Sequence, residues 1–319
     1  MTLEPSGVDR TQSVADPDRG ITILTPPPTT LARVPYDELV DRAFAALPAD
    51  LPRNPREILV ALDVDGTLLT TSGASEAIRR TIATLRAGGV HVTIVTGRGV
   101  GACMPVLTEV GIECGWVVAS NGSYTASITP DSVEVVDREF FDPAPVIDAV
   151  LPVIPEALFA VENEDGSFRI SAPFPPHELI EQWRLDSLDG LRSRPTTKVV
   201  VRVPHMERAE FAEHVARMDL SMAEWAIGWT SWMDVHRRGV TKGTGVRALC
   251  SRLGVPSHGV VAIGDGTNDI PMFAVAHHAV AMGGASEEVR VHADTVTGPV
   301  DHDGAAAVMD AIAQYLDLA

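Results

Sequence analysis

Residues 58–68 read Ile-Leu-Val-Ala-Leu-Asp-Val-Asp-Gly-Thr-Leu, and this stretch decides the fold. Its first five residues are all apolar, which is typical of a strand buried on both faces of a parallel sheet. The run ends at Asp63, and Asp65 follows two residues later. The ligand crevice of an open parallel sheet lies at the carboxyl ends of its strands, so we expect both carboxylates in that crevice.

Helix and strand patterns alternate on both sides of this run. Ser75 can cap a helix that ends at a Gly-Gly pair, and the strands predicted next are 90–95 and 116–119. The alternation resumes later, with a predicted helix over 244–253 and a strand over 260–264. The pattern predicts an α/β fold with a doubly wound parallel sheet.

The segment 141–228 has a different pattern of predicted elements, with short strands and helices and a turn at Asp165-Gly166 that indicates a hairpin. It predicts an inserted α+β cap domain with a mixed sheet. The catalytic core is then predicted to comprise residues 33–140 and 229–319. We expect the cap to close over the crevice as a lid, with hinges near residues 139–143 and 228–231.

Composition excludes several classes of function. Lys and Arg total 25 against 43 Asp and Glu, a formal net charge of −18, which argues against nucleic-acid or membrane partners. The three cysteines form no CxxC pair, which indicates a reducing compartment and no zinc site. Residues 1–32 are rich in Pro, Thr, Ser and Asp, predict a flexible tail and contain no apolar leader, so we predict a cytoplasmic protein.

Polar groups follow the predicted strands or begin a predicted helix at four places. Each alone is a common turn or a solvated side chain, but their joint order along the chain makes coincidence a poor explanation. Lysine is a rare choice here, because the chain contains only Lys198 and Lys242. The four groups are Asp63-Val64-Asp65-Gly66-Thr67-Leu68, Thr96-Gly97-Arg98, Lys242, and Gly264-Asp265-Gly266-Thr267-Asn268-Asp269.

Together these groups resemble the four motifs of the haloacid dehalogenase superfamily, in the family's order, over roughly residues 56–319. The stretches 120–122, 239–243 and 280–283 are similar to the Cof-type, sugar-phosphatase-like branch, whose C2-type α/β cap follows the third strand. The resemblance implies a phosphoric monoester hydrolase that depends on Mg²⁺.

The resemblance assigns catalytic roles that the residue types also support. Asp63 would attack phosphorus and form an aspartyl phosphate, which splits the reaction into two steps. Asp65 would protonate the leaving group and then deprotonate the attacking water. Metal ligands would be Asp63, the backbone carbonyl of Asp65, and Asp265, with Asp269 holding metal-bound water or Lys242 in a supporting position.

The phosphoryl oxygens would be bound by the Thr96 hydroxyl with the backbone at Gly97, by Lys242 and by Asn268. The substrate is then a small phosphorylated metabolite, most simply a sugar phosphate. Two alternatives stay open at this point: a phosphomannomutase-like phosphotransferase, and a non-catalytic sugar-phosphate sensor. The intact acidic residues argue against the sensor.

Several cap residues have both a structural and a functional interpretation. Trp225, Trp229 and Trp232 could stack on a sugar ring, but aromatic residues at strand spacing are more often packing. His236 is more simply structural. Basic residues of the cap could reach a second anionic group, but such residues are usually paired on the surface; they are Arg192, Arg194, Lys198 and Arg202.

Overall fold

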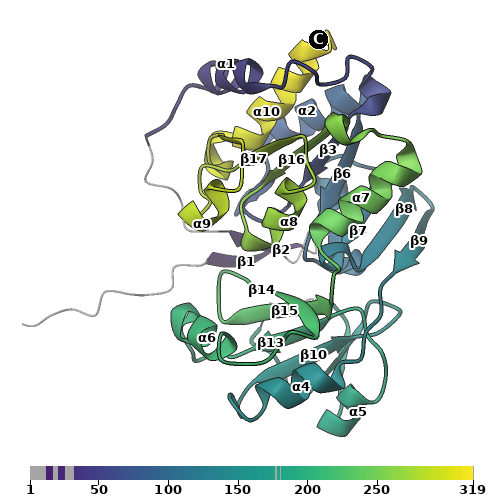
Figure 1. The fold of residues 1–319 in the computed structure, drawn as a ribbon, viewed down its shortest axis with the longest axis vertical. Helices are drawn as coiled ribbons and strands as arrows, with labels where there is room; N and C mark the ends of the chain where they lie inside the picture. Colours follow the sequence, from purple (N-terminus) through teal and green to yellow (C-terminus); the bar gives the residue numbers. More distant parts are fainter. Residues whose placement is uncertain (1–11, 17–20, 26–31, 177, 180, 319) are drawn as a thin grey trace, which may run out of the picture.

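The structure, a computed structural model, describes residues 12–16, 21–25, 32–176, 178–179 and 181–318, with backbone only for the first two segments. Two large sheets dominate it, one with eight strands and one with six. Figure 1 shows the larger sheet with its helices in one half of the molecule and the smaller sheet in the other. We call the larger unit the core and the smaller one the cap.

Six strands of the core sheet are parallel, and a hairpin extends it antiparallel at one edge. This hairpin was not predicted from the sequence. In sheet order the strands are β18 (Thr295–Val296), β17 (His278–Ala281), β16 (Val260–Gly264), β3 (Leu59–Leu62), β6 (His91–Val95), β7 (Gly115–Ala119), β8 (Tyr124–Thr129) and β9 (Ser132–Arg138).

Strand β3 shows why the apolar run is continuous. Val60 and Leu62 pack on one face of the sheet, and Leu59 and Ala61 pack on the other. Helices α2 (Glu76–Ala87), α3 (Val100–Glu109) and α10 (Gly304–Tyr315) cover the first face, while α7 (Lys242–Leu253), α8 (Ile270–Phe273) and α9 (Glu287–Arg290) cover the second. The prediction of a doubly wound α/β fold is confirmed.

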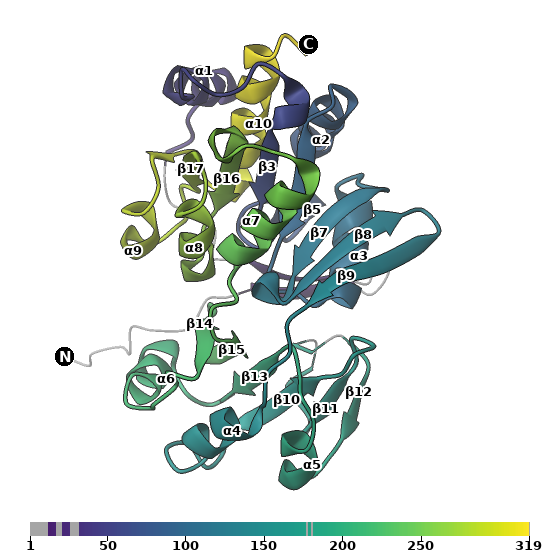
Figure 2. The same ribbon diagram turned by 45° about the vertical axis from the view of Figure 1, so that its right-hand side comes forward.

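The cap sheet is covered by helices on one face only. Helices α4 (Ala144–Val150), α5 (Leu188–Arg192) and α6 (Arg208–Val215) bury that face. Figure 2 shows α4 and α5 on the side of the cap that lies away from the core. The strands in sheet order are β12 (Trp183–Leu185), β11 (Phe168–Ile170), β10 (Leu158–Glu162), β13 (Val199–Arg202), β15 (Trp232–Arg237) and β14 (Ala223–Ile227).

The predicted end of the cap at residue 228 is wrong. Strand β15 lies beyond it and pairs with both β13 and β14 in the cap sheet. Residues 228–231 are therefore the turn of a cap hairpin and not a hinge, and the chain returns to the core between Arg237 and Lys242.

The prediction of a tail without structure over residues 1–32 fails in two places. Strands β1 (Gln12–Asp16) and β2 (Ile21–Thr25) form an antiparallel pair. The β-branched residues of β2 favour an extended backbone, which outweighs the polar composition around them. Residues 1–11, 17–20 and 26–31 lie outside the described residues. Helix α1 (Tyr36–Ala46) follows and packs through Leu39 and Val40 on α10.

None of the helices in the described part of the chain is both long enough and apolar enough to cross a bilayer. The cytoplasmic location stays a prediction.

Gly243 tests the packing of α7 on α8. A Cβ atom at this position would lie 2.0 Å from the carbonyl oxygen of Pro271, which is backbone and cannot rotate away. We expect Gly243→Ala to lower the free energy of unfolding by about 1–3 kcal/mol, measured by urea denaturation.

Gly101→Ala is the matched control, because Gly101 also occupies the second position of a helix, α3, but has no heavy atom within 4 Å of its Cβ position. It should be neutral or stabilising by up to about 1 kcal/mol. Equal destabilisation by both substitutions would contradict the packing argument.

Candidate active site

A buried lysine holds two carboxylates together at the carboxyl end of β3. Lys242 begins α7, and its Nζ donates to Asp63 Oδ1 and to Asp269 Oδ1, each at 2.6 Å. Thr241 precedes it with a capping box that fixes the start of the helix. Lys242 and Asp269 are fully buried, and Asp63 is 6% exposed. Lys242 therefore lies in direct contact with two of the acidic residues singled out in the sequence.

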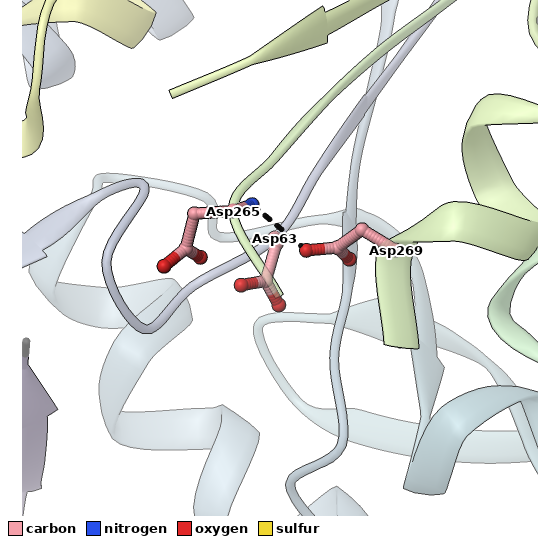
Figure 3. A group of neighbouring side chains, drawn as sticks. All are labelled: Asp63, Asp265 and Asp269. Atoms are coloured by element: carbon pink, nitrogen blue, oxygen red, sulfur yellow. Dashed lines mark hydrogen bonds between the residues drawn. The ribbon is translucent and has the colours of Figure 1, made fainter. Parts of the chain in front are cut away.

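Asp265 completes a cluster of three carboxylates with Asp63 and Asp269, one oxygen of each lying within 4.8 Å of the others (Figure 3). Asp269 is already engaged, because its Oδ2 accepts from the backbone N–H groups of Asp265 and Gly266 at 2.9 Å. Asp265 Oδ1 accepts from the Thr67 hydroxyl at 3.3 Å, but its buried Oδ2 has no partner. An unpaired buried carboxylate oxygen beside a second carboxylate fits a cation.

The electrostatics of the cluster support the same conclusion. Burial, then the charge of Asp269, raises the pKa of Asp63 to about 7 against the lowering effect of Lys242. Burial and the charge of Asp63 raise the pKa of Asp265 well above its usual value. Burial opposes the charge of Lys242, but the two carboxylates outweigh it and raise the pKa of that ammonium group. The cluster has more negative than positive charge and would be stabilised by a cation.

Asp65 lies in the turn after β3 and pairs with an arginine. Arg98 donates from Nε to Asp65 Oδ2 at 2.8 Å and from Nη2 to Asp65 Oδ1 at 2.5 Å. Two parallel hydrogen bonds fix the plane of the carboxylate. Arg98 belongs to the Thr96-Gly97-Arg98 motif, but its contact with Asp65 was not predicted from the sequence.

The loop after β6 belongs to the core and contacts the cap through hydrogen bonds. Thr96 is buried, and its hydroxyl oxygen accepts from the Arg98 N–H at 3.2 Å. The carbonyl oxygen of Gly97 accepts from the ammonium group of Lys198 at 2.9 Å, and the same group lies 3.0 Å from Asp234 Oδ1. Lys198 therefore ties the cap to the predicted phosphate-binding loop.

Asn268 belongs to a hydrogen-bonded chain that also joins core and cap. Its amide donates to Asn121 Oδ1 at 3.0 Å, and Asn121 Nδ2 lies 3.0 Å from Nε2 of His236 on β15. Burial lowers the pKa of His236 to about 4, which keeps the ring neutral. Asn121 has a positive φ of 50°, a backbone conformation that asparagine tolerates better than most residues. The structural interpretation of His236 agrees with these contacts.

A cavity of about 480 Å³ lies between the core and the cap. The core side contains most of the residues singled out in the sequence, and the cap side contributes aromatic and charged residues. Trp225 is absent from the lining and is 43% exposed, and Lys242 and Asp269 lie behind the wall. The predicted site residues that line the cavity are Asp63, Asp65, Thr96, Gly97, Asp265 and Asn268.

Of the four basic cap residues considered in the sequence, only Lys198 lines the cavity. Arg202 pairs with Glu178 through two hydrogen bonds of 2.7 Å. Arg192 pairs with Asp148, remote from the acidic cluster. Arg192 and Arg202 are therefore both paired, although Arg202 is buried and not on the surface.

A doubly wound core with a carboxylate cluster at the carboxyl ends of its strands, under an inserted cap, defines a class of α/β hydrolytic enzymes. The model of haloacid dehalogenase-like hydrolases matches residues 60–309, and the chain belongs to this family. The family predicted from the sequence is confirmed.

Curated relatives cover most of the chain. It is 27% identical to a phosphoglycolate phosphatase of Methanothrix thermoacetophila, over 79% of this chain and 95% of the relative. It is also 27% identical to the pyridoxal phosphate phosphatase YbhA of Escherichia coli, over 81% and 97%. The solved structure of the subclass IIB sugar phosphatase BT4131 matches with a TM-score of 0.67 and 20% identity, over 82% of this chain and all of that one, which supports the fold. The predicted enzyme class, a phosphoric monoester hydrolase, is confirmed.

Glu162 provides a test of the contact between cap and core. This buried carboxylate accepts from the hydroxyls of Thr197 and Ser120, while its Oε1 has no partner. Burial, opposed by the charge of Lys198, raises its pKa to about 7 from an ordinary value of 4.5. The Glu162 carboxyl group therefore ionises at a lower pH in the unfolded state than in the folded state. Its contribution to the free energy of unfolding is lost as pH rises from the ordinary pKa of 4.5 to the folded-state pKa of about 7.

We expect Glu162→Gln to become more stable relative to the wild type as pH rises from 5 to 8, by roughly 2 kcal/mol in the free energy of unfolding. Urea denaturation at both pH values measures the difference. The exposed Glu164→Gln on the same hairpin should show no such trend. A Glu162→Gln difference that is independent of pH would contradict the assignment.

Proposed function

We propose that the protein is a magnesium-dependent phosphatase that hydrolyses a small phosphomonoester through an aspartyl phosphate on Asp63. The observation that supports this most directly is the position of Asp63. It directly follows β3 at the wall of the cavity, and the ammonium group of Lys242 lies 2.6 Å from its Oδ1. A carboxylate held in this way can attack a phosphorus atom in line with the leaving oxygen.

In the first step, a carboxylate oxygen of Asp63 forms a bond to phosphorus while the bond from phosphorus to the ester oxygen breaks. Asp65, which lines the same cavity, gives its proton to the departing alkoxide. In the second step, water attacks phosphorus, Asp65 accepts a proton from it, and Asp63 is released with inorganic phosphate. Lys242 supplies a fixed positive charge where negative charge develops.

The metal site is proposed on Asp63, Asp265 and the backbone carbonyl of Asp65. The orphaned Oδ2 of Asp265 and a donor set made only of oxygen fit Mg²⁺ rather than a softer metal. Bound there, Mg²⁺ would polarise the phosphoryl group and offset its charge. Asp269 has both oxygens occupied and would support the site by holding Lys242.

The phosphoryl oxygens are proposed to meet the Thr96 hydroxyl, the backbone at Gly97 and the amide of Asn268. All three residues line the cavity beside Asp63. Lys242 contributes its charge from behind Asp63. The substrate is a small phosphorylated metabolite; relatives named for phosphoglycolate, pyridoxal phosphate and HMP-PP support that size. The sugar phosphate expected from the sequence is one member of this class.

Asp63→Asn should abolish release of phosphate, because a neutral amide oxygen is a poor nucleophile toward phosphorus. The protein should remain folded, since burial of a neutral group is less costly than burial of a carboxylate. Phosphate release with Mg²⁺ measures the effect, and Asp131→Asn in the exposed β8–β9 turn is the control. Near-normal turnover by a folded Asp63→Asn protein would overturn the mechanism.

Asp65→Asn should reduce kcat by about 10²- to 10⁴-fold, the usual size of general acid–base catalysis. The substituted side chain can still accept a hydrogen bond from Arg98, so we expect the turn to keep its conformation. The phosphoenzyme should accumulate more in the variant than in the wild type if hydrolysis is also slowed. An unchanged kcat would remove Asp65 from the mechanism.

Activity should require Mg²⁺, and Ca²⁺ should inhibit, because its larger and less regular shell places the Asp63 carboxylate in a less reactive geometry. Chelator treatment followed by titration of each metal measures this dependence. Asp265→Asn should raise the Mg²⁺ concentration needed for half-maximal activity. Full activity in excess chelator would refute the metal site.

A further inference from the structure

A second cavity, of about 390 Å³, lies at one edge of the core sheet. The carboxyl ends of the parallel strands form the active site, whereas His278 begins β17 at the other end of that strand. Side chains alternate along a strand, so His278 shares a face with Val280, which packs in the same cluster as α10. Helix α1 lines the cavity from above this face, and Figure 1 shows α1 at the end of the core away from the cap.

The helix that roofs this cavity lies outside the part of the chain that matches the family model. Helix α1 ends at Ala46, and the match covers residues 60–309. The hydroxyl of Tyr36 donates to Asp310 Oδ2 on α10 at 2.6 Å, and Leu39 is buried against the same helix. The roof is therefore fixed in place, and the cavity does not follow from membership of the family.

One buried polar side chain in the cavity wall has no partner. His278 is 3% exposed, and neither of its ring nitrogens forms a hydrogen bond or an ion pair with any described residue. His236 is as deeply buried, but its ring nitrogens lie 3.0 Å from Asn121 Nδ2 and 3.1 Å from Ser123 Oγ. Because buried polar groups are nearly always hydrogen-bonded, the ring of His278 is available to a ligand in the cavity.

The state of this ring restricts the ligand. Burial lowers the pKa of His278, against the opposing charge of Asp294. The ring is therefore neutral at neutral pH, with one N–H donor and one acceptor nitrogen. A hydroxyl group can bond with either nitrogen, because it both donates and accepts. The rest of the ligand would contact apolar side chains, among them Leu39, Val280 and Val308.

Two basic residues also line the cavity, but neither requires an anionic ligand. Arg42 is exposed and pairs with Glu38 on the same helix, so its charge is already compensated. His302 is only partly buried, and water can satisfy its ring. The one deeply buried polar group of the wall without a partner among the described residues is the neutral ring of His278, which favours a neutral ligand.

Water alone is a poor partner for this wall. A buried water molecule needs about two to four polar partners, and the hydroxyl of Thr297 already donates to the carbonyl oxygen of Gly304 at 2.9 Å. A ligand would also remove the apolar part of the wall from water. The volume of about 390 Å³ lies within the range of about 300–1,000 Å³ that is typical of sites for small molecules.

We propose that this cavity is a binding site for a small neutral molecule with an apolar body and one hydroxyl group. The hydroxyl bonds with the ring of His278, and the apolar body lies between α1 and the sheet. A substituted phenol is the simplest compound of this class. The site is independent of the proposed phosphatase function, because no described residue lines both cavities.

Three compounds of similar size provide the first test. 4-Ethylphenol carries the hydroxyl, ethylbenzene lacks it, and 4-ethylbenzoate carries a negative charge. In NMR titrations of the whole chain, we expect a Kd of about 0.1 mM for 4-ethylphenol and at least about tenfold weaker binding of the other two. No binding of 4-ethylphenol, equal binding of ethylbenzene, or tighter binding of 4-ethylbenzoate would overturn the inference.

The second test places the hydroxyl at His278. His278→Leu should weaken binding of 4-ethylphenol by about tenfold and leave that of ethylbenzene unchanged, because only a hydrogen bond is lost. His292→Leu is the matched control, because His292 is exposed and does not line the cavity. An equal loss for both compounds, or equal effects of the two substitutions, would overturn the assignment.

The third test fills the cavity from its roof and decides the inference even if His278→Leu does not fold. Ala43 lines the cavity, so Ala43→Phe should abolish binding of 4-ethylphenol. Ala45 is exposed on the same helix and is not part of the wall, so Ala45→Phe should leave the Kd unchanged. Undiminished binding by a folded Ala43→Phe protein would place the compound elsewhere and contradict the proposed site.

Discussion

The site depends on one buried ammonium group. Lys242 lies between Asp63 and Asp269 with no exposure to solvent, and without it two carboxylates would be buried side by side. Removing one partner from such a cluster leaves an uncompensated buried charge, which is far more costly than losing a surface ion pair. The surrounding core has to hold three segments in register for this contact to form: the end of β3, the start of α7 and the loop after β16.

That requirement explains why the packing of α7 is so close. Gly243 lies against the backbone of Pro271, and Gly245 lies against the side chain of Val118, so the helix that carries Lys242 contributes no side chain of its own at either contact. Asp269 in turn is fixed by backbone N–H groups of its own loop. The lysine and its partners are therefore positioned by the backbone, which limits the freedom of the side chains before any ligand binds.

The acidic residues of the site could be predicted because they follow the geometry of a parallel sheet. Asp63 and Asp265 directly follow adjacent strands, so their proximity is expected once both runs are recognised as parallel strands. The pairing of Asp65 with Arg98 could not be predicted, since it depends on side-chain directions in two separate turns. The cap could be predicted because its short strands and helices break the alternation of the core. Its end was misplaced, because the pairing of β15 with β13 is a long-range contact without a local signal in the sequence. The apolar cluster of Phe168 and Val200 with Trp232 packed against it is likewise a property of the assembled sheet.

Both lysines of the chain are buried, Lys198 between cap and core and Lys242 inside the core. The folded protein consequently presents almost no lysine side chain to solvent, and the basic groups of its outer surface are mainly arginines. Acylating reagents that target amines would find these two side chains protected. Modification of Lys198 would report separation of the cap from the loop at Gly97, whereas modification of Lys242 would require opening of the core itself. The two lysines would thus report two different opening motions, one of the cap and one of the core.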